Sequence, residues 1–294
     1  MKRFRIISRL RHFLFHLRYL SFFFIISCCL VMIPSTMLKA SEIDMFGYFR
    51  SEITLQDLSG DTEALLQNKL RLDLEWDIWE NILIGGNVNF INYEGDTRGN
   101  FLVKIPRSVS AGIPGEFRSF FDYSLNDEME LDNLFIRFRF PSFDLTLGKQ
   151  QISFGSGYAW NPTDLFNVKS LIDPTDEKPG HEAIRIDYPL SFSSRLLFIL
   201  DVEDSIGDPG FLLRYKTTIG HFDYSMSYSV KEFTITDFAS FALKDQKRNM
   251  LGFDLAGEAF GVGLWFEGAY NWVDWGEDFG EWVIGLDYTW ENGF

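Results

Sequence analysis

The stretch LRLDLEWDIW, residues 70–79, places an apolar side chain at every second position. The intervening positions carry Arg71, Asp73, Glu75 and Asp77. Successive side chains of a β-strand point to opposite faces, so a two-residue repeat separates into one apolar and one charged surface, whereas a helix would mix the two. The pattern therefore predicts a strand with hydrocarbon on one side and charge on the other.

The same alternation recurs along the chain and predicts about twelve strands. Most of these segments contain about 9–14 residues, which exceeds the usual strand of globular proteins and approaches the length of a tilted membrane strand. The predicted strands cover residues 44–55, 66–79, 82–93, 129–140, 143–153, 181–189, 192–202, 210–219, 221–232, 248–259, 261–271 and 281–290.

The connections alternate between very short and long. The short ones are residues 80–81, 141–142, 189–191, 220 and 260–261. The longer ones are residues 56–65, 94–128, 154–180, 203–209, 233–247 and 272–280. This alternation of short and long connections is typical of a transmembrane barrel, which has short periplasmic turns and longer extracellular loops. A soluble sandwich with Greek-key connections does not require such an alternation.

Aromatic residues make up 17% of the chain, and Trp and Tyr lie near many strand ends, as in the interfacial girdles of membrane barrels. In hydrocarbon every backbone group must be paired, so long antiparallel strands imply closure. The sequence thus predicts an all-β, transmembrane antiparallel up-and-down β-barrel of about 12 strands. Its apolar side would face lipid and its charged side a water-filled lumen.

The first forty residues resemble an export signal, with a basic leader, an apolar run and small residues before Ser41. We therefore expect a cleaved signal peptide over 1–40 and an outer-membrane barrel over 41–294, the alternative being an uncleaved membrane anchor. Both cysteines, Cys28 and Cys29, lie in the leader, so a disulfide framework in the mature chain is excluded. Cleavage removes seven of the 27 basic residues and leaves 20 basic against 42 acidic residues. The strong negative charge of the mature chain disfavours binding to nucleic acid.

The C-terminal residues allow two interpretations. Phe294 is aromatic, as is usual for the last strand of an outer-membrane barrel, but Asn292 breaks the alternation and ENGF resembles another turn. The barrel is either complete with twelve strands, or the chain is part of a larger barrel.

One segment, LGKQQISFGSGYAWNPTDLFN at 147–167, resembles porin-like outer-membrane proteins of Gram-negative bacteria. The matching positions are Gly148, Lys149, Gln150, Gly155, Gly157 and the run Trp160–Phe166, preceded by a strand–turn–strand from residue 132. Phe154 stands where the pattern has Trp. The resemblance implies a porin-like barrel in the outer membrane and says little about its substrate.

The loop at 154–180 is the third long connection, which in many porins folds inward and narrows the channel. Two roles remain open for it, a structural plug or rim, and direct contact with solute. The residues that we expect to line this constriction from the loop are Trp160, Asp164, Asp173, Asp176 and Glu177.

Basic residues recur on the charged side of the fourth to eighth predicted strands. They are Arg137, Arg139, Arg185, Arg195, Arg214 and Lys216, with Asp187 and Asp201 on the same side. A basic wall opposite an acidic loop would produce a transverse field that orients polar solutes. The alternative is a set of ion pairs that fill a narrow barrel. The sequence predicts no ion selectivity.

These features predict a porin-like channel for passive diffusion of small hydrophilic solutes, with no cofactor and no metal site. Its partners would be outer-membrane lipid, lipopolysaccharide and the barrel-assembly machinery, and a homo-oligomer is compatible with the sequence. The alternative is a non-conducting barrel that acts as an adhesin or as an export or assembly partner. A hydrolase fits less well, because the mature chain has only His181 and His221 and lacks a GxSxG motif.

Overall fold

The computed structural model describes residues 43–58, 61–105, 107–157, 160–167, 180–202, 209–237 and 242–288. The predicted signal peptide, the acidic residues Asp173, Asp176 and Glu177, and the C-terminal residues 289–294 lie outside the described residues. None of the helices in the described part of the chain is long and apolar enough to cross a membrane.

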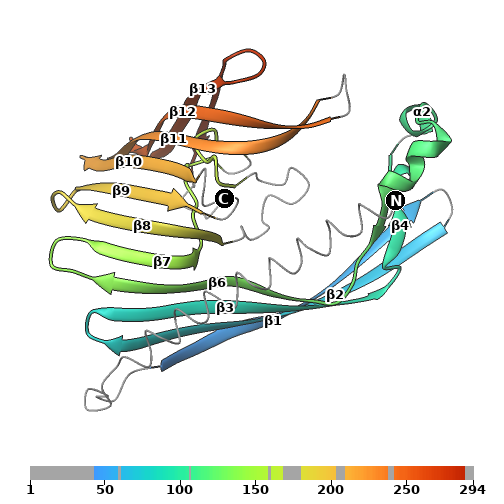
Figure 1. Ribbon diagram of the computed structural model, residues 1–294, viewed down its shortest axis with the longest axis horizontal. Helices are drawn as coiled ribbons and strands as arrows, with labels where there is room; N and C mark the ends of the chain where they lie inside the picture. Colours follow the sequence, from blue (N-terminus) through green and yellow to red (C-terminus); the bar gives the residue numbers. More distant parts are fainter. Residues whose placement is uncertain are drawn as a thin grey trace. The chain divides into compact units, whose positions relative to one another are not determined.

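Twelve antiparallel strands form one sheet in which each strand pairs with the next long strand of the chain (Figure 1). The predicted all-β, up-and-down architecture is confirmed. Within the described residues β1 and β14 form the two edges and are not paired with each other, so the predicted closure is not seen there. The strands are β1 (Ile43–Leu58), β2 (Asp61–Trp79), β3 (Ile82–Gly95), β6 (Glu128–Arg139), β7 (Asp144–Gln150), β8 (His181–Pro189), β9 (Ser194–Asp201), β10 (Gly210–Ile219), β11 (Phe222–Asp237), β12 (Ala242–Ala259), β13 (Val262–Val273) and β14 (Phe279–Asp287).

Two of the connections predicted to be long are largely strand. The β1–β2 ladder continues to the pair Leu58 and Asp61, and the β11–β12 ladder continues to Asp237 and Ala242. The alternation of side chains weakens there, but backbone hydrogen bonds do not depend on it. The prediction of loops over 56–65 and 233–247 was therefore wrong for most of their residues.

The connection between β3 and β6 carries a small structure of its own. Strands β4 (Arg98–Asn100) and β5 (Asp122–Ser124) pair with each other, and the short helices η2 (Phe101–Val103), α2 (Arg107–Ser110) and η3 (Gly115–Phe121) lie between them. The sequence predicted only a long connection here, because three-residue strands are too short to display an alternation.

The two faces of the sheet differ sharply in polarity, and we name them the apolar face and the polar face. On β2 the apolar face presents Leu70, Leu72 and Leu74, all of which are exposed. The neighbouring Lys69, on the polar face, is only 7% exposed. The same arrangement holds on β11, where Met226 is 53% exposed and Ser227 is 2% exposed.

Candidate functional site

After β7 the chain leaves the sheet and packs against its polar face. We call residues 151–157 and 160–167 the inserted segment. Glu267 on β13 holds this segment, because its carboxylate accepts hydrogen bonds from the backbone N–H groups of Ser156 (2.9 Å), Gly157 (3.2 Å) and Thr163 (2.8 Å). The Thr163 hydroxyl donates a fourth, also at 2.8 Å. Glu267 is fully buried, and these contacts satisfy its charge.

Gly155 is required at the closest approach of the inserted segment to Glu267. Its φ is +92°, a conformation that side-chain-bearing residues seldom adopt. A Cβ atom placed on it would lie 2.6 Å from both carboxylate oxygens of Glu267. Both the backbone conformation and the lack of space for a Cβ atom therefore require glycine at position 155 of the sequence motif.

Asp164 fixes the turn inside the inserted segment. Its carboxylate accepts hydrogen bonds from the backbone N–H groups of Phe154, Phe166 and Asn167, each at 3.2 Å. The Asn167 amide donates both to Asp164 and to the carbonyl oxygen of Ile152. Asp164 is buried among these donors, and its contacts stabilise the fold of the segment itself. Trp160, by contrast, is 44% exposed.

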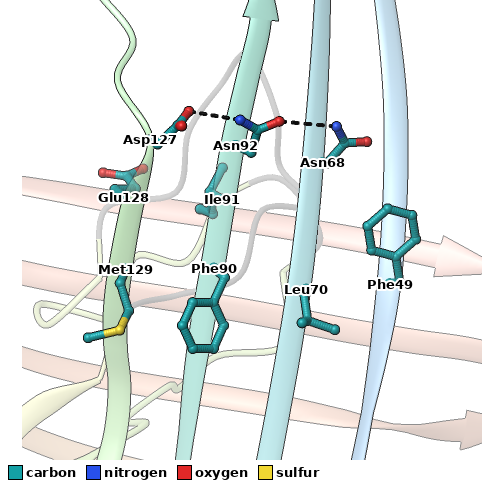
Figure 2. Close-up of a pocket in the computed structure, with 9 residues that line it drawn as sticks. All are labelled: Phe49, Asn68, Leu70, Phe90, Ile91, Asn92, Asp127, Glu128 and Met129. Atoms are coloured by element: carbon teal, nitrogen blue, oxygen red, sulfur yellow. Dashed lines mark hydrogen bonds between the residues drawn. The ribbon is translucent and has the colours of Figure 1, made fainter.

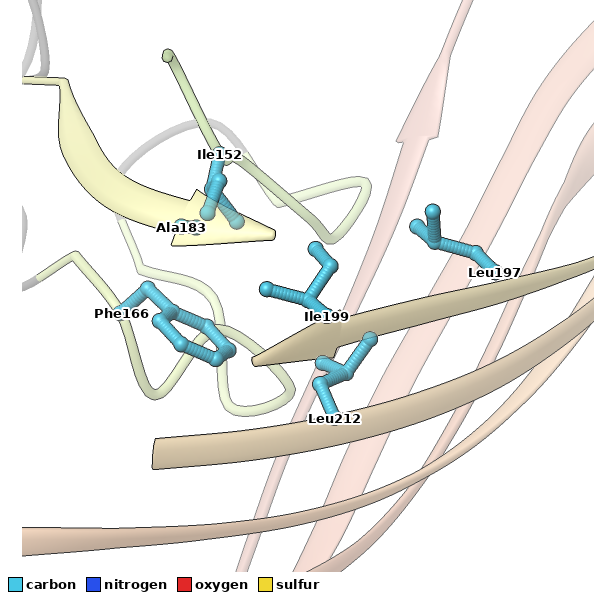
Figure 3. Close-up of a cluster of buried hydrophobic side chains, with 6 residues drawn as sticks. All are labelled: Ile152, Phe166, Ala183, Leu197, Ile199 and Leu212. Atoms are coloured by element: carbon cyan, nitrogen blue, oxygen red, sulfur yellow. The ribbon is translucent and has the colours of Figure 1, made fainter. Parts of the chain in front are cut away.

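Apolar side chains fill the space beneath the inserted segment. Figure 3 shows Ile152 and Phe166 facing Ala183 on β8, Ile199 on β9 and Leu212 on β10, and all five are buried. Burial of a side chain of this size contributes about 1.5–3 kcal/mol relative to exposure. The inserted segment is thus held by a hydrophobic core as well as by hydrogen bonds.

A buried polar network lies beside this core. One ring nitrogen of His181 faces the Asn167 side-chain oxygen at 3.2 Å, and the other lies 3.8 Å from Asp201. The Lys231 ammonium pairs with Asp201 at 3.0 Å and lies 5.3 Å from the centre of the Phe166 ring. The network joins β8, β9 and β11 to the inserted segment.

A second buried ion pair supports the other side of the segment. Arg214 on β10 pairs with Asp254 on β12 at 2.6 Å. Its guanidinium also lies 5.1 Å from the centre of the Phe154 ring, a distance suited to a cation–π contact. Phe154, where the family pattern has Trp, thus still packs as an aromatic partner for a cation.

The basic residues predicted on the channel wall differ in their partners. Arg214 is buried behind the inserted segment, whereas the others lie nearer the short turns. The partners are Asp187 for Arg185 (2.7 and 3.0 Å), Asp77 for Arg139 (3.6 Å), Asp223 for Lys216 (2.6 Å) and Thr146 for Arg137 (3.3 Å). Arg195 forms no ion pair with a described carboxylate.

Sequence reasoning missed Glu267, Asp254 and Lys231 as parts of the site. For Glu267 the signal was the only charged residue of β13, in LWFEGAY, whereas Asp254 and Lys231 stand among other polar residues on the same face of their strands. That pattern predicts a buried partner but not its identity, because Glu267 and Thr163 are 104 residues apart.

On the apolar face a row of polar side chains crosses β1, β2 and β3 and reaches Asp127. Figure 2 shows Asn68 donating to Asn92 (3.3 Å) and Asn92 donating to Asp127 (3.1 Å). Ser51 donates to Asn68 at 2.7 Å and completes the row, which we call the amide ladder. Next to it lies an exposed apolar row of side chains from four adjacent strands, namely Phe49, Leu70, Phe90 and Met129.

The histidines that the structure describes are His181 and His221. Both ring nitrogens of His181 face Asn167 and Asp201, and His221 is exposed at the turn between β10 and β11. Within the described ranges no three His, Cys, Asp or Glu residues are grouped so that they could hold a metal ion.

No protein-family model and no curated protein matches the chain. Among the solved structures that the chain resembles are outer-membrane channels and porins. The Acinetobacter baumannii channel DcaP is 14% identical (TM-score 0.40; 79% of this chain and 64% of that chain covered). Pseudomonas putida OprB is 12% identical (TM-score 0.44; 85% and 70%), and a mutant Rh. blastica porin is 10% identical (TM-score 0.36; 85% and 91%). The chain therefore spans less than two thirds of DcaP, and these similarities assign neither a family nor a function.

Proposed function

We propose that the chain is a porin-like channel of the Gram-negative outer membrane that lets small hydrophilic solutes diffuse passively. In this proposal the apolar face contacts lipid, the polar face borders water, and the inserted segment narrows the passage. The export signal expected over residues 1–40 would bring the chain to that membrane.

The observation that carries the proposal is the inverted polarity of the sheet. A soluble protein buries apolar side chains and exposes charged ones. Here Leu286, Ile284 and Trp282 of β14 are 69%, 62% and 67% exposed, whereas Glu267 and Asn271 of β13 are fully buried. Exposed hydrocarbon on strand after strand is favourable only where the surrounding solvent is itself hydrocarbon.

The length of the apolar stripe supports the same environment. From Leu70 to Trp76 on β2 the apolar positions extend over six residue steps, or about 20 Å of strand, and Ile78 beyond them is buried. A strand tilted by roughly 45° would place this stripe across about half of an apolar band of about 25 Å. The amide ladder adjoins one end of the stripe on β2, at Asn68.

The test is single-channel conductance of the chain, purified from the membrane fraction of cells that express it, in a planar bilayer. Discrete openings that increase with salt concentration are the expected result. Inserted, β-rich protein that never conducts would contradict the channel and leave a structural barrel. In the membrane the expected partners are outer-membrane lipid, lipopolysaccharide and the barrel-assembly machinery, and cross-linking in cells would also reveal a homo-oligomer.

The second candidate is a non-conducting barrel that acts through its long connection between β3 and β6. The observation that favours it is a group of exposed apolar side chains there, since Phe120 is 79% exposed and Phe101 and Val103 are 53% and 55% exposed. Exposed apolar groups of this kind are typical of a binding surface. Deletion of residues 101–121 would abolish adhesion or export under this hypothesis and leave conductance intact under the first.

A further inference from the structure

A cavity of about 340 Å³ lies on the polar face beside two short turns, those that join β6 to β7 and β8 to β9. Three arginines, Arg137, Arg185 and Arg195, line it, together with two acidic residues, Asp144 and Asp187. The three arginines come from three different strands, and the turn residues 140–143 form part of the rim.

The charges in this cavity are not fully paired. Arg185 donates two hydrogen bonds to Asp187, at 2.7 and 3.0 Å, so this pair is internally neutral. Arg137 donates only to the Thr146 hydroxyl, at 3.3 Å, and lies over the Phe135 ring. Neither Arg137 nor Arg195 therefore forms a direct salt bridge with a described carboxylate, although the charge of Arg195 also acts on Asp223 at the turn between β10 and β11.

We propose that this cavity is a binding subsite for a small anionic solute, a carboxylate or a phosphate, at the short-turn mouth of the channel. The inference rests on the proposed channel function and adds a class of solute to it. A guanidinium presents N–H groups in a planar fork that matches the oxygens of a carboxylate or a phosphate. Arg137 and Arg195 offer two such forks to one cavity.

Asp144 keeps this subsite weak. It lines the same cavity, it forms no ion pair within the described residues, and its backbone lies opposite that of Asp187 in the β7–β8 ladder. Its negative charge opposes an incoming anion that the arginines attract. A channel needs this balance, because a solute must bind well enough to enter and weakly enough to leave. The neighbouring Lys216 pairs with Asp223 at 2.6 Å, and Arg195 also acts on that carboxylate, so Asp223 further limits the attraction of an anion to this subsite.

The test compares the reversal potential of variants in a potassium chloride gradient. We expect the chloride-to-potassium permeability ratio to fall about threefold for each of Arg137→Ser and Arg195→Ser, as is usual for loss of a partly exposed charge. Asp144→Asn should raise the ratio by a similar factor. The matched control is Arg98→Ser, an exposed arginine on β4 at the opposite end of the strands.

A second measurement keeps this proposal separate from the channel itself. Binding of inorganic phosphate to the detergent-solubilised chain, followed by phosphorus NMR line broadening, requires no conductance. Loss of binding in the double variant Arg137→Ser/Arg195→Ser supports the subsite even if the wild-type chain forms no pore. The absence of a pore would overturn the channel function and not the subsite. Absence of binding to the wild-type chain, an unchanged permeability ratio in the arginine variants, or an equal change in Arg98→Ser would overturn the subsite.

Discussion

Thr163 and Glu267 are joined twice, because the backbone N–H and the hydroxyl of Thr163 both donate to the same carboxylate oxygen at 2.8 Å. This contact ties the middle of the inserted segment to a strand far along the chain. The position of the inserted segment therefore depends on β13 as well as on the strands next to it in the sequence.

Replacement of Glu267 by Ala should destabilise the folded chain by about 3 kcal/mol, because several buried donors of the inserted segment lose their acceptor at once. The free energy of unfolding in urea, measured in micelles, would show it. Glu80→Ala, at the exposed turn between β2 and β3, is the control and should change little. An equal loss in the two variants would mean that the carboxylate does not hold the segment.

Gly155→Ala and Gly276→Ala form a matched pair. Both glycines have positive φ, +92° and +97°, so both substitutions strain the backbone. Only at Gly155 would the new Cβ collide with Glu267, since nothing lies within 4 Å of a Cβ at Gly276. We expect Gly155→Ala to cost at least about 1 kcal/mol more than Gly276→Ala. Equal unfolding free energies would show that the inserted segment moves away without cost.

Arg214→Met should cost about 3–5 kcal/mol, because it leaves the buried Asp254 without its partner. The double variant Arg214→Met/Asp254→Leu should recover most of this loss, since no isolated charge then remains buried. The unfolding free energies of the two single variants and the double variant form a double-mutant cycle. A double variant that is as unstable as the sum of the two single variants would contradict direct pairing.

The apolar face offers a test of the membrane environment. Leu72→Arg should destabilise the inserted protein by about 2–4 kcal/mol if Leu72 faces hydrocarbon. Glu75→Arg, on the polar face of the same strand, should have little effect on folding into lipid vesicles. Both positions are exposed, so a soluble fold would tolerate both changes equally. The folded fraction in vesicles, monitored by gel mobility without heating, distinguishes the two cases.

The sequence was sufficient to place the twelve strands, because a two-residue period survives wherever one face contacts a single kind of solvent. Each strand of the twelve-stranded sheet overlaps its predicted range, although β1, β2, β11 and β12 extend well beyond it and β7 ends earlier; β4 and β5 were not predicted. The extensions were missed because backbone pairing continues where the side-chain period ends. The alternation was enough to assign Arg214 to the polar face. It could not predict that Arg214 would be buried behind the inserted segment.

The site was less predictable because its contacts join distant parts of the chain. The motif at 155–167 indicated a special loop, but Asp164, which we expected to line the constriction, is buried and accepts backbone hydrogen bonds within the turn. Nothing in the sequence indicated that Glu267 would accept its backbone donors or that His181 would lie beside Asp201. The roles of Trp160 and of the basic residues toward solute stay predictions.

Every donor in the amide ladder points the same way, from Ser51 through Asn68 and Asn92 to Asp127. Contacts between apolar side chains can be exchanged for one another, so they discriminate poorly between alternative alignments of neighbouring strands. A shift of one residue would turn the side chains of the amide ladder to the other face, and a shift of two would set Leu66 or Leu70 opposite Asn92. The amide ladder therefore favours the observed register of strands β1 to β3 over these alternatives.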